Sequence, residues 1–252
     1  MKVLRLTAHQ IRYEQRGFWR NPAGTFFTIG LPVLMLVVFA TLNRGHRVTD
    51  VDGRQFAAYF VPGMLAFGLI TATYGNLAAR MVARREWGLL KRARSTPLPA
   101  SALLGGLVGN ALIICGFITV VVLVVGRVGY DVAFPTRWPL TIAVVVIGAT
   151  AFCAMGMALT TVIPNIDAAD AMVFGTLLPV MFISGVFQPV PAESILHRIA
   201  DVFPVAHLFD AALATSGADQ GLAPLGHLAI VMGWGLAGAA IAVRRFEWEP
   251  RR

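Results

Sequence analysis

Few side chains of this chain are of a type that does chemistry, and they are scattered along its length. The histidines are His9, His46, His197, His207 and His227. None of them follows the HExxH or CxxC…HxxxH spacing that holds zinc. The one polar grouping that could form a reaction centre consists of Glu193, His197, Asp201 and His207. It would suit an enzyme that modifies lipids at a membrane surface, and this function stays open as an alternative.

Two glycine patterns bear on nucleotide binding. Residues 233–238 read GWGLAG and fit GxGxxG, but they lie inside an apolar run without the strand, turn and helix of a dinucleotide site. The pattern therefore indicates close helix packing. The P-loop motif GxxxxGK[ST] is absent, since neither Lys2 nor Lys91 follows a glycine. We expect no cofactor in this chain, so any ATP-driven work would need a second polypeptide.

The composition indicates a membrane protein. Of 252 residues, 57% are hydrophobic and only 13% are charged, whereas soluble domains have about 45–50% and about 25%. The net charge of +8 is typical of arginine-rich flanks that orient membrane helices, so nucleic acid is not an expected partner.

Six apolar segments have about the 20 residues that a helix needs to cross the bilayer. They lie near 24–43, 57–79, 101–126, 138–162, 171–190 and 222–243. The segments contain almost no charged residues, which disfavours ion-coupled transport. We therefore predict an all-α polytopic membrane protein with six transmembrane helices.

The positions of lysine and arginine predict the orientation. With both termini inside, 15 of the 21 fall in inner segments, before residue 22, within 80–94 and after 243. The other six fall in outer loops. Because cytoplasmic loops are enriched in basic residues, both termini are predicted to be cytoplasmic.

Three segments outside the spans are expected to be ordered. Residues 1–22 form an amphipathic helix on the inner surface, with Leu4, Ala8, Ile11, Gln15 and Phe18 opposite the arginines. The inner loop 80–100 contains a short helix that suits docking to a protein, although a solvated loop is equally compatible with its composition. The segment 184–204 is too apolar for an ordinary loop and is predicted to re-enter the outer leaflet. The six-helix domain then covers 23–243, and 244–252 is a cytoplasmic tail.

Two motifs resemble those of the membrane subunit of type-2 ATP-binding-cassette (ABC-2) exporters, the group that includes daunorubicin-type drug permeases. Residues 85–92 read REWGLLKR and residues 95–98 read STPL. They resemble the family's E-R-E-x-G-T-x-x-x-L-x-x-T-P stretch, with Leu89 in place of its threonine and Ala93 in place of its leucine. The matching residues are Arg85, Glu86, Gly88, Thr96 and Pro97, and the Pro62-Gly63 pair is also common there.

The second motif follows the fifth span. It resembles the family's P-x-x-x-x-S-G-x-x-x-P…P pattern, and it would shape an outer gate. Its residues are Pro179, Ser184, Gly185, Pro189 and Pro204.

The resemblance implies a mechanism. Two permease subunits, identical or different, would pair in the plasma membrane, each docked on a cytoplasmic ABC ATPase that binds ATP-Mg. The segments around 1–20 and 84–96 would form the docking site, with Glu86 pairing an arginine of the ATPase and Trp87 filling an apolar groove.

The resemblance also implies the cargo and its path. The cargo would be a hydrophobic or amphipathic drug-like or lipid-like compound, as in antibiotic efflux, with polysaccharide or glycolipid export as the alternative. The path would be lined by Phe26, Phe27, Phe67, Phe174 and Phe182, under a lid formed by 184–204 and hinged at Ser184-Gly185.

Overall fold

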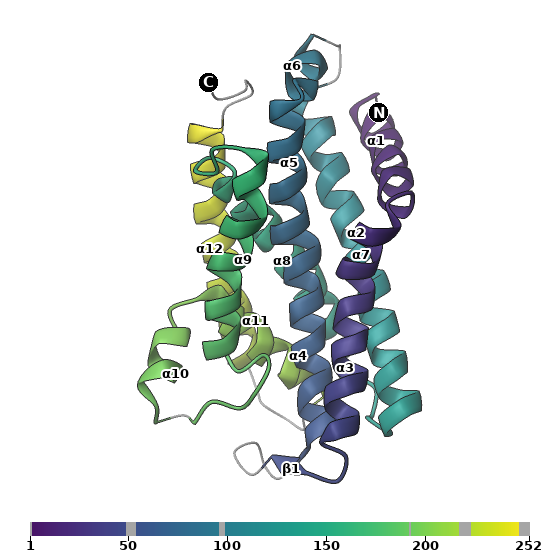
Figure 1. Ribbon diagram of the computed structural model, residues 1–252, viewed down its shortest axis with the longest axis vertical. Coiled ribbons are helices and arrows are strands. Elements are labelled where there is room, and N and C mark those ends of the chain that lie inside the picture. The colour runs from purple at the N-terminus through teal and green to yellow at the C-terminus, as the bar shows by residue number, and fades with distance from the viewer. Residues whose placement is uncertain (1, 49–53, 96–98, 192, 217–222, 247–252) are drawn as a thin grey trace.

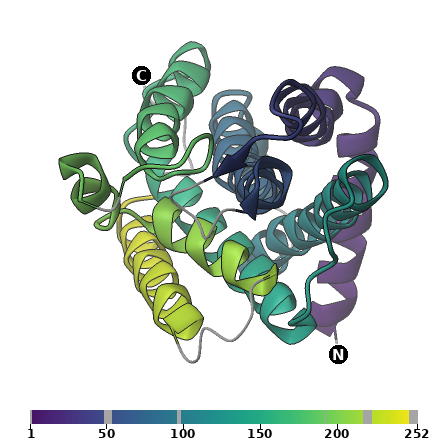
Figure 2. The same cartoon turned by 90° about the horizontal axis from the view of Figure 1, so that it is seen from below.

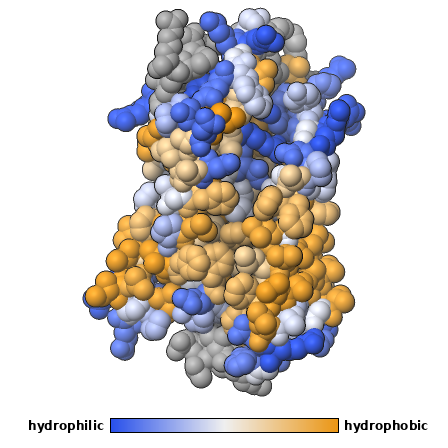
Figure 3. Space-filling view, viewed as in Figure 1, coloured by the Kyte–Doolittle hydropathy of each residue, from blue (hydrophilic) through white to orange (hydrophobic). Residues whose placement is uncertain are grey.

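The computed structural model describes residues 2–48, 54–95, 99–191, 193–216 and 223–246. These residues form a bundle of long helices (Figure 1). The first helix and the last turn of the final helix lie at the same end of the bundle, which we call the terminal end; the opposite end is the distal end. Figure 3 shows an apolar band around the middle and distal part, with hydrophilic residues beyond it at both ends.

Six helical segments among the described residues are long and apolar enough to cross a membrane. They are Pro22–Leu42, Phe56–Glu86, Ala100–Tyr130, Trp138–Leu159, Ile166–Ile183 and Ala223–Arg245. The predicted all-α fold with six spans is therefore confirmed. The largest difference is in the fifth span, which was predicted at 171–190 but covers Ile166–Ile183. The second span was predicted to end near residue 79 but continues to Glu86, because a helix satisfies its own backbone beyond the apolar region.

Two of the spans are interrupted by a single π-helical turn. The first consists of α2 (Pro22–Thr25), η1 (Phe26–Gly30) and α3 (Leu31–Leu42). The second consists of α4 (Phe56–Ile70), η2 (Thr71–Gly75) and α5 (Asn76–Glu86). The two π-turns lie against each other, and such turns recur at functional sites.

The remaining elements are single helices and short connections. The other spans are α7 (Ala100–Tyr130), α8 (Trp138–Leu159), α9 (Ile166–Ile183) and α12 (Ala223–Arg245). The shorter elements are α1 (Lys2–Trp19), α6 (Leu89–Arg94), α10 (Ile195–Ala200), α11 (Pro204–Leu213), the 3₁₀ turn η3 (Ala214–Ser216) and the strands β1 (Arg47–Val48) and β2 (Arg54–Gln55). The strands pair antiparallel, Arg47 with Gln55 and Val48 with Arg54, and join α3 to α4 at the distal end.

The second span is the centre of the bundle. Almost every residue of α4 is buried, and α4 packs on α3, α7, α8 and α11, while α5 packs on α8 and α9. Figures 1 and 2 show α3 on one side of this span and α9 on the other. The outer faces of α3 and α9 are largely exposed. The second span thus packs against the first, third, fourth and fifth spans.

The N-terminal segment is a helix as predicted, and it packs along α7. Three glycines of α7, Gly105, Gly106 and Gly109, leave space for Thr7, Gln10 and Ile11 respectively. Small residues allow two helices to approach closely, so α1 is fixed to the bundle at the terminal end.

The burial of α1 in the bundle is uneven. Phe18 and Glu14 are buried, with Glu14 2% exposed, whereas Leu4 and Ala8 are exposed. The buried positions are those that contact α5, and the predicted contact of the apolar side with the membrane surface stays a prediction.

The GxGxxG pattern in α12 is a packing motif. A Cβ at Gly235 would lie 2.7 Å from Ala151 Cα, and one at Gly238 would lie 2.9 Å from Met155 Cα, both on α8. A Cβ at Gly233 would meet nothing within 4 Å. The predicted packing role is therefore confirmed for two of the three glycines.

We expect Gly238→Leu to lower the thermal stability of the purified protein, because a side chain there collides with the α8 backbone. Overpacking of this kind costs about 1–3 kcal/mol. Gly233→Leu is the matched control and should unfold at the wild-type temperature, as followed by circular dichroism. Equal melting temperatures for both variants would contradict the packing of α12 on α8.

Candidate functional site

A buried arginine ties the terminal end of α5 to the connection between α8 and α9. Arg85 is 1% exposed. Its Nη1 donates a hydrogen bond to the Thr160 carbonyl oxygen at 2.9 Å, and its Nη2 donates to the carbonyl oxygens of Ile163 at 2.6 Å and Pro164 at 3.3 Å. A guanidinium can be buried only when such acceptors surround it. Arg85 therefore fixes the chain between α8 and α9.

The neighbouring glutamate holds the start of α9. Glu86 Oε1 accepts a hydrogen bond from the Ile166 N–H at 2.9 Å, and Asn165 Oδ1 accepts one from the Ala168 N–H at 2.9 Å. Backbone N–H groups in the first turn of a helix lack partners within the helix, and a carboxylate also complements the helix dipole. One oxygen of Glu86 is thus committed to α9 within this chain.

Directly after Glu86, the chain presents apolar side chains to the outside. Gly88 has a φ of +67°, which ends α5 and redirects the chain into α6. Leu90 is buried and anchors α6 in the bundle, while Trp87 is 66% and Leu89 43% exposed. In Figure 1, α6 projects beyond the rest of the terminal end. Trp87 and Leu89 on this projection form a candidate contact surface.

Two predicted residues of this motif, Thr96 and Pro97, lie outside the described residues. The described part of the motif ends at Ser95, whose N–H donates to the Arg92 carbonyl oxygen at 3.1 Å.

The N-terminal helix is bonded to the same region. Arg84 Nη2 lies 2.7 Å from Glu14 Oε2, and Gln10 Nε2 donates to Glu14 Oε1 at 2.8 Å. The Arg80 guanidinium lies over the Phe18 ring at 5.5 Å. Glu14 was not among the residues predicted from the sequence, although one signal existed: it is the single acidic residue among five lysines and arginines before residue 22. These contacts join α1 to the last turns of α5, directly before α6.

At the distal end, the second span holds the chain that leaves α9. Tyr59 Oη donates a hydrogen bond to the Gly185 carbonyl oxygen at 2.5 Å, and Gly185 has a φ of +78°. The Val186 carbonyl oxygen passes directly over Gly63, where any Cβ would collide with it. The predicted residues Ser184 and Gly185 and the Pro62-Gly63 pair therefore meet at one place.

These residues border an open pocket of about 400 Å³. Its lining includes Ser184, Gly185 and Pro189 from the predicted set, together with Glu193 and Asp210. The Ser184 hydroxyl is buried and has no hydrogen-bond partner among the described residues. Burial raises the pKa of the Asp210 carboxyl, and nearby His227 acts in the opposite direction.

The other two predicted residues of the motif after the fifth span, Pro179 and Pro204, do not line this pocket. Pro179 lies inside α9, and Pro204 is buried in the first turn of α11. Except for two partly exposed positions, α11 is buried and packs on α4, α8 and α12.

Polar groups also connect the spans near the middle of their length, where no site was predicted from the sequence. Asn76 Nδ2 donates to Thr28 Oγ1 at 2.6 Å, and the hydroxyls of Tyr74 and Thr176 are 3.2 Å apart. Tyr74 belongs to the π-turn η2 and Thr176 to α9. The second span thus contacts α9 through Glu86 at its start, Tyr74 at its middle and Tyr59 just beyond its end.

Comparisons with known proteins agree with the features above. The family described as ABC-2 type transporter matches residues 7–216. The inner membrane transport permease YadH of Escherichia coli K12 is 23% identical over 155 residues, which are 61% of this chain and 59% of that protein. Nodulation protein J of Sinorhizobium fredii is 29% identical over 174 residues, 65% of this chain and 63% of that protein. The matched region is thus under two thirds of each relative's length.

We expect Arg85→Gln to destabilise the protein by at least about 2 kcal/mol, because hydrogen bonds from a charged donor contribute about 1.5–3 kcal/mol and three carbonyl groups lose theirs. Thermal unfolding in detergent measures this effect. Arg92→Gln, an exposed position on α6, is the control and should leave the unfolding temperature unchanged. A wild-type unfolding temperature for Arg85→Gln would show that the buried guanidinium does not hold the α8–α9 connection.

Proposed function

Because the chain belongs to the ABC-2 type transporter family and is a membrane transport subunit of it, we propose that it is the permease of an ATP-driven exporter in the plasma membrane. A separate cytoplasmic ATPase binds ATP-Mg and supplies the energy, while this chain provides the path. The observation that carries the proposal is a pair of exposed apolar side chains, Trp87 directly after α5 and Leu89 at the start of α6. In Figure 1, α6 projects beyond the rest of the terminal end.

The terminal end faces the cytoplasm in this proposal. Described basic residues gather there, on α1, α5, α6 and the last turn of α12. Figure 3 shows the corresponding hydrophilic surface at this end. This placement agrees with the rule that cytoplasmic segments carry excess positive charge.

The ATPase docks on the surface formed by α6 and α1. Trp87 supplies an aromatic anchor of the kind that dominates interface energies, and exposed Lys91 and Arg92 on α6 can attract acidic groups of the partner. Arg84, near the end of α5, pairs with Glu14 of α1. Because α6 follows α5 directly, a force applied to α6 reaches α1 through α5.

Docking is coupled to the distal end through the second span. Glu86 contacts α9 at its first residue, and Tyr59 holds the Gly185 carbonyl beyond its last. A displacement of α5 by the ATPase therefore moves α9 together with the segment 184–204, which acts as the outer lid.

The path lies between two permease subunits, along the face that α3, the second span and α9 form. Four of the five predicted aromatic residues, Phe26, Phe27, Phe174 and Phe182, are about half exposed on α9 and the first span. Phe67 is 4% exposed and packs on Phe187, so it belongs to the core and not to the path.

An amphipathic cargo fits this face best. The exposed phenylalanine rings offer apolar contacts, while the hydroxyls of Tyr74 and Thr176 are hydrogen-bonding groups near mid-height. Membership in a transport family supports a non-enzymatic role.

We expect Trp87→Ala to weaken ATPase docking by about tenfold or more, because truncation of an interface anchor costs at least about 2 kcal/mol. The measurement is vanadate-sensitive ATP hydrolysis that co-purifies with the chain from its native membrane. Trp138→Ala, a half-exposed tryptophan at the start of α8, serves as the control and retains the ATPase. Undiminished co-purification with Trp87→Ala would refute docking on α6.

Glu86→Ala separates docking from coupling. We expect this variant to retain the ATPase, since Trp87 and Leu89 at the junction of α5 and α6 are still exposed, but to lose most efflux because the link to Ile166 is gone. Reconstitution in liposomes measures ATP hydrolysis and export together. Efflux at the wild-type rate per ATP hydrolysed would contradict the proposed coupling through α9.

A further inference from the structure

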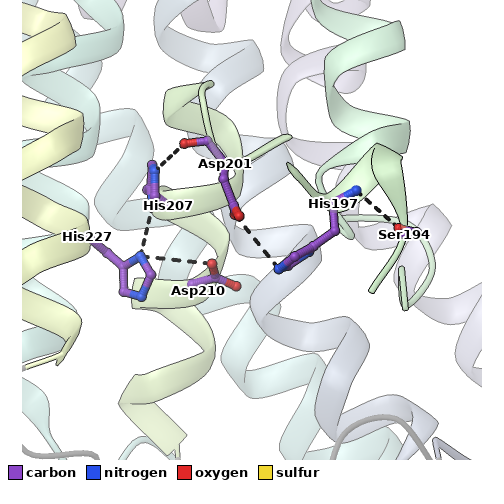
Figure 4. Close-up of polar contacts among 6 residues, drawn as sticks. All are labelled: Ser194, His197, Asp201, His207, Asp210 and His227. Carbon is purple, nitrogen blue, oxygen red and sulfur yellow. Dashed lines mark hydrogen bonds and ion pairs between the residues drawn. The ribbon is translucent and has the colours of Figure 1, made fainter. Parts of the chain in front are cut away.

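Two histidines and an aspartate meet near the distal end, on two helices that follow one another in the chain. His207 and Asp210 belong to α11, and His227 belongs to α12. The Nδ1 atoms of the two histidines are 2.8 Å apart, and Asp210 Oδ2 lies 3.9 Å from His227 Nδ1. One ligand atom from each residue can be chosen so that all three lie within 4.8 Å of one another. Figure 4 shows the side chains converging from the two helices.

The hydrogen bonds of His207 determine which of its nitrogens is available. Its Nε2 lies 2.8 Å from the Asp201 backbone carbonyl oxygen. A carbonyl oxygen can only accept, so Nε2 carries the proton of this bond. In the neutral ring, Nδ1 then has a free lone pair, and this atom points at His227. Metal-binding histidines are oriented in the same way, by donating their other N–H to a carbonyl or carboxylate.

The donor set indicates the kind of ion. Two imidazole nitrogens and one carboxylate oxygen are ligands for zinc and the neighbouring divalent transition metals, whereas calcium and magnesium require mainly oxygen. With metal–nitrogen bonds of about 2.0–2.1 Å in a tetrahedral site, the two Nδ1 atoms would be about 3.3 Å apart. The rings need to separate only slightly from their present distance.

The surroundings leave one coordination position accessible. His207 is 6% exposed, while His227 and Asp210 are about one-third exposed. Asp210 also lines the pocket of about 400 Å³ beside Glu193 and His197. The two carboxylates favour the approach of a cation, and a fourth ligand can enter from the pocket.

We propose that His207, Asp210 and His227 form a binding site for a zinc-class divalent metal ion at the distal end. The bound ion links α11 to α12 and, through the Asp201 carbonyl, to the end of α10. The site is independent of the proposed export function, because it is built from contacts within one chain.

The test is metal titration of the full chain, purified in detergent with a histidine-free affinity tag and stripped with a chelator. Co²⁺ is the probe, since its visible absorption reports nitrogen and oxygen ligation, and Zn²⁺ is then added as the competitor. We expect one ion per chain. His207→Ala and His227→Ala should each weaken binding at least about tenfold, and Asp210→Asn should weaken it as well.

Two histidines away from the cluster provide controls. His9→Ala and His46→Ala should bind the metal like the wild type. Because His207 is buried and its replacement could disturb folding, His227→Gln, at a position about one-third exposed, is the decisive variant, with its helical content checked by circular dichroism. Stoichiometric Co²⁺ binding that survives in His227→Gln, or no binding by the wild type, would overturn the site. In that case the two histidines simply share a proton across the α11–α12 contact.

Discussion

The desolvation of one guanidinium constrains the terminal end of this molecule. Arg85 lies where water cannot reach it, so its N–H groups must find acceptors in the protein. The Thr160 and Ile163 carbonyls provide them at the point where α8 has ended and its last carbonyls lack helical partners. Successive helical residues are about 100° apart; with Arg85 inward, Trp87 faces nearly the opposite way. The inward position of Arg85 therefore also accounts for Glu86, which is half-buried, and for Trp87, which is exposed.

Hydropathy predicted the six spans, because the cost of unsatisfied backbone in lipid leaves few alternatives. It could not predict that α5 continues to Glu86, since helix length beyond the membrane depends on tertiary contacts. The helix at 1–22 was predictable from its periodicity, but its orientation was not. Glu14 faces inward because Arg84, seventy residues away, lies there to receive it. The π-turns η1 and η2 and the polar bonds beside them also depend on contacts between distant segments, which a single sequence does not reveal.

The motif that follows the fifth span was likewise predictable from the sequence only in part. The order of prolines and the Ser184-Gly185 pair predicted a break after the fifth span, and α9 ends at Ile183. The need for glycine at residue 63 is intelligible only in the fold, where the Val186 carbonyl crosses α4. The histidines were dismissed as metal ligands because their sequence spacing matches no motif. They meet because α11 packs against α12. A metal site of this kind is recognised from distances in space and not from spacing in the sequence.

The contacts along α9 differ in strength, and the difference determines how the helix can move. At its ends, Glu86 holds the Ile166 N–H at 2.9 Å and Tyr59 holds the Gly185 carbonyl at 2.5 Å. The middle contact, between the hydroxyls of Tyr74 and Thr176, is exposed and longer. A buried hydrogen bond is costly to break without replacement. The chain that follows α9 is therefore held at Gly185, whose carbonyl is bonded to Tyr59. It keeps this bond only when it moves together with the second span.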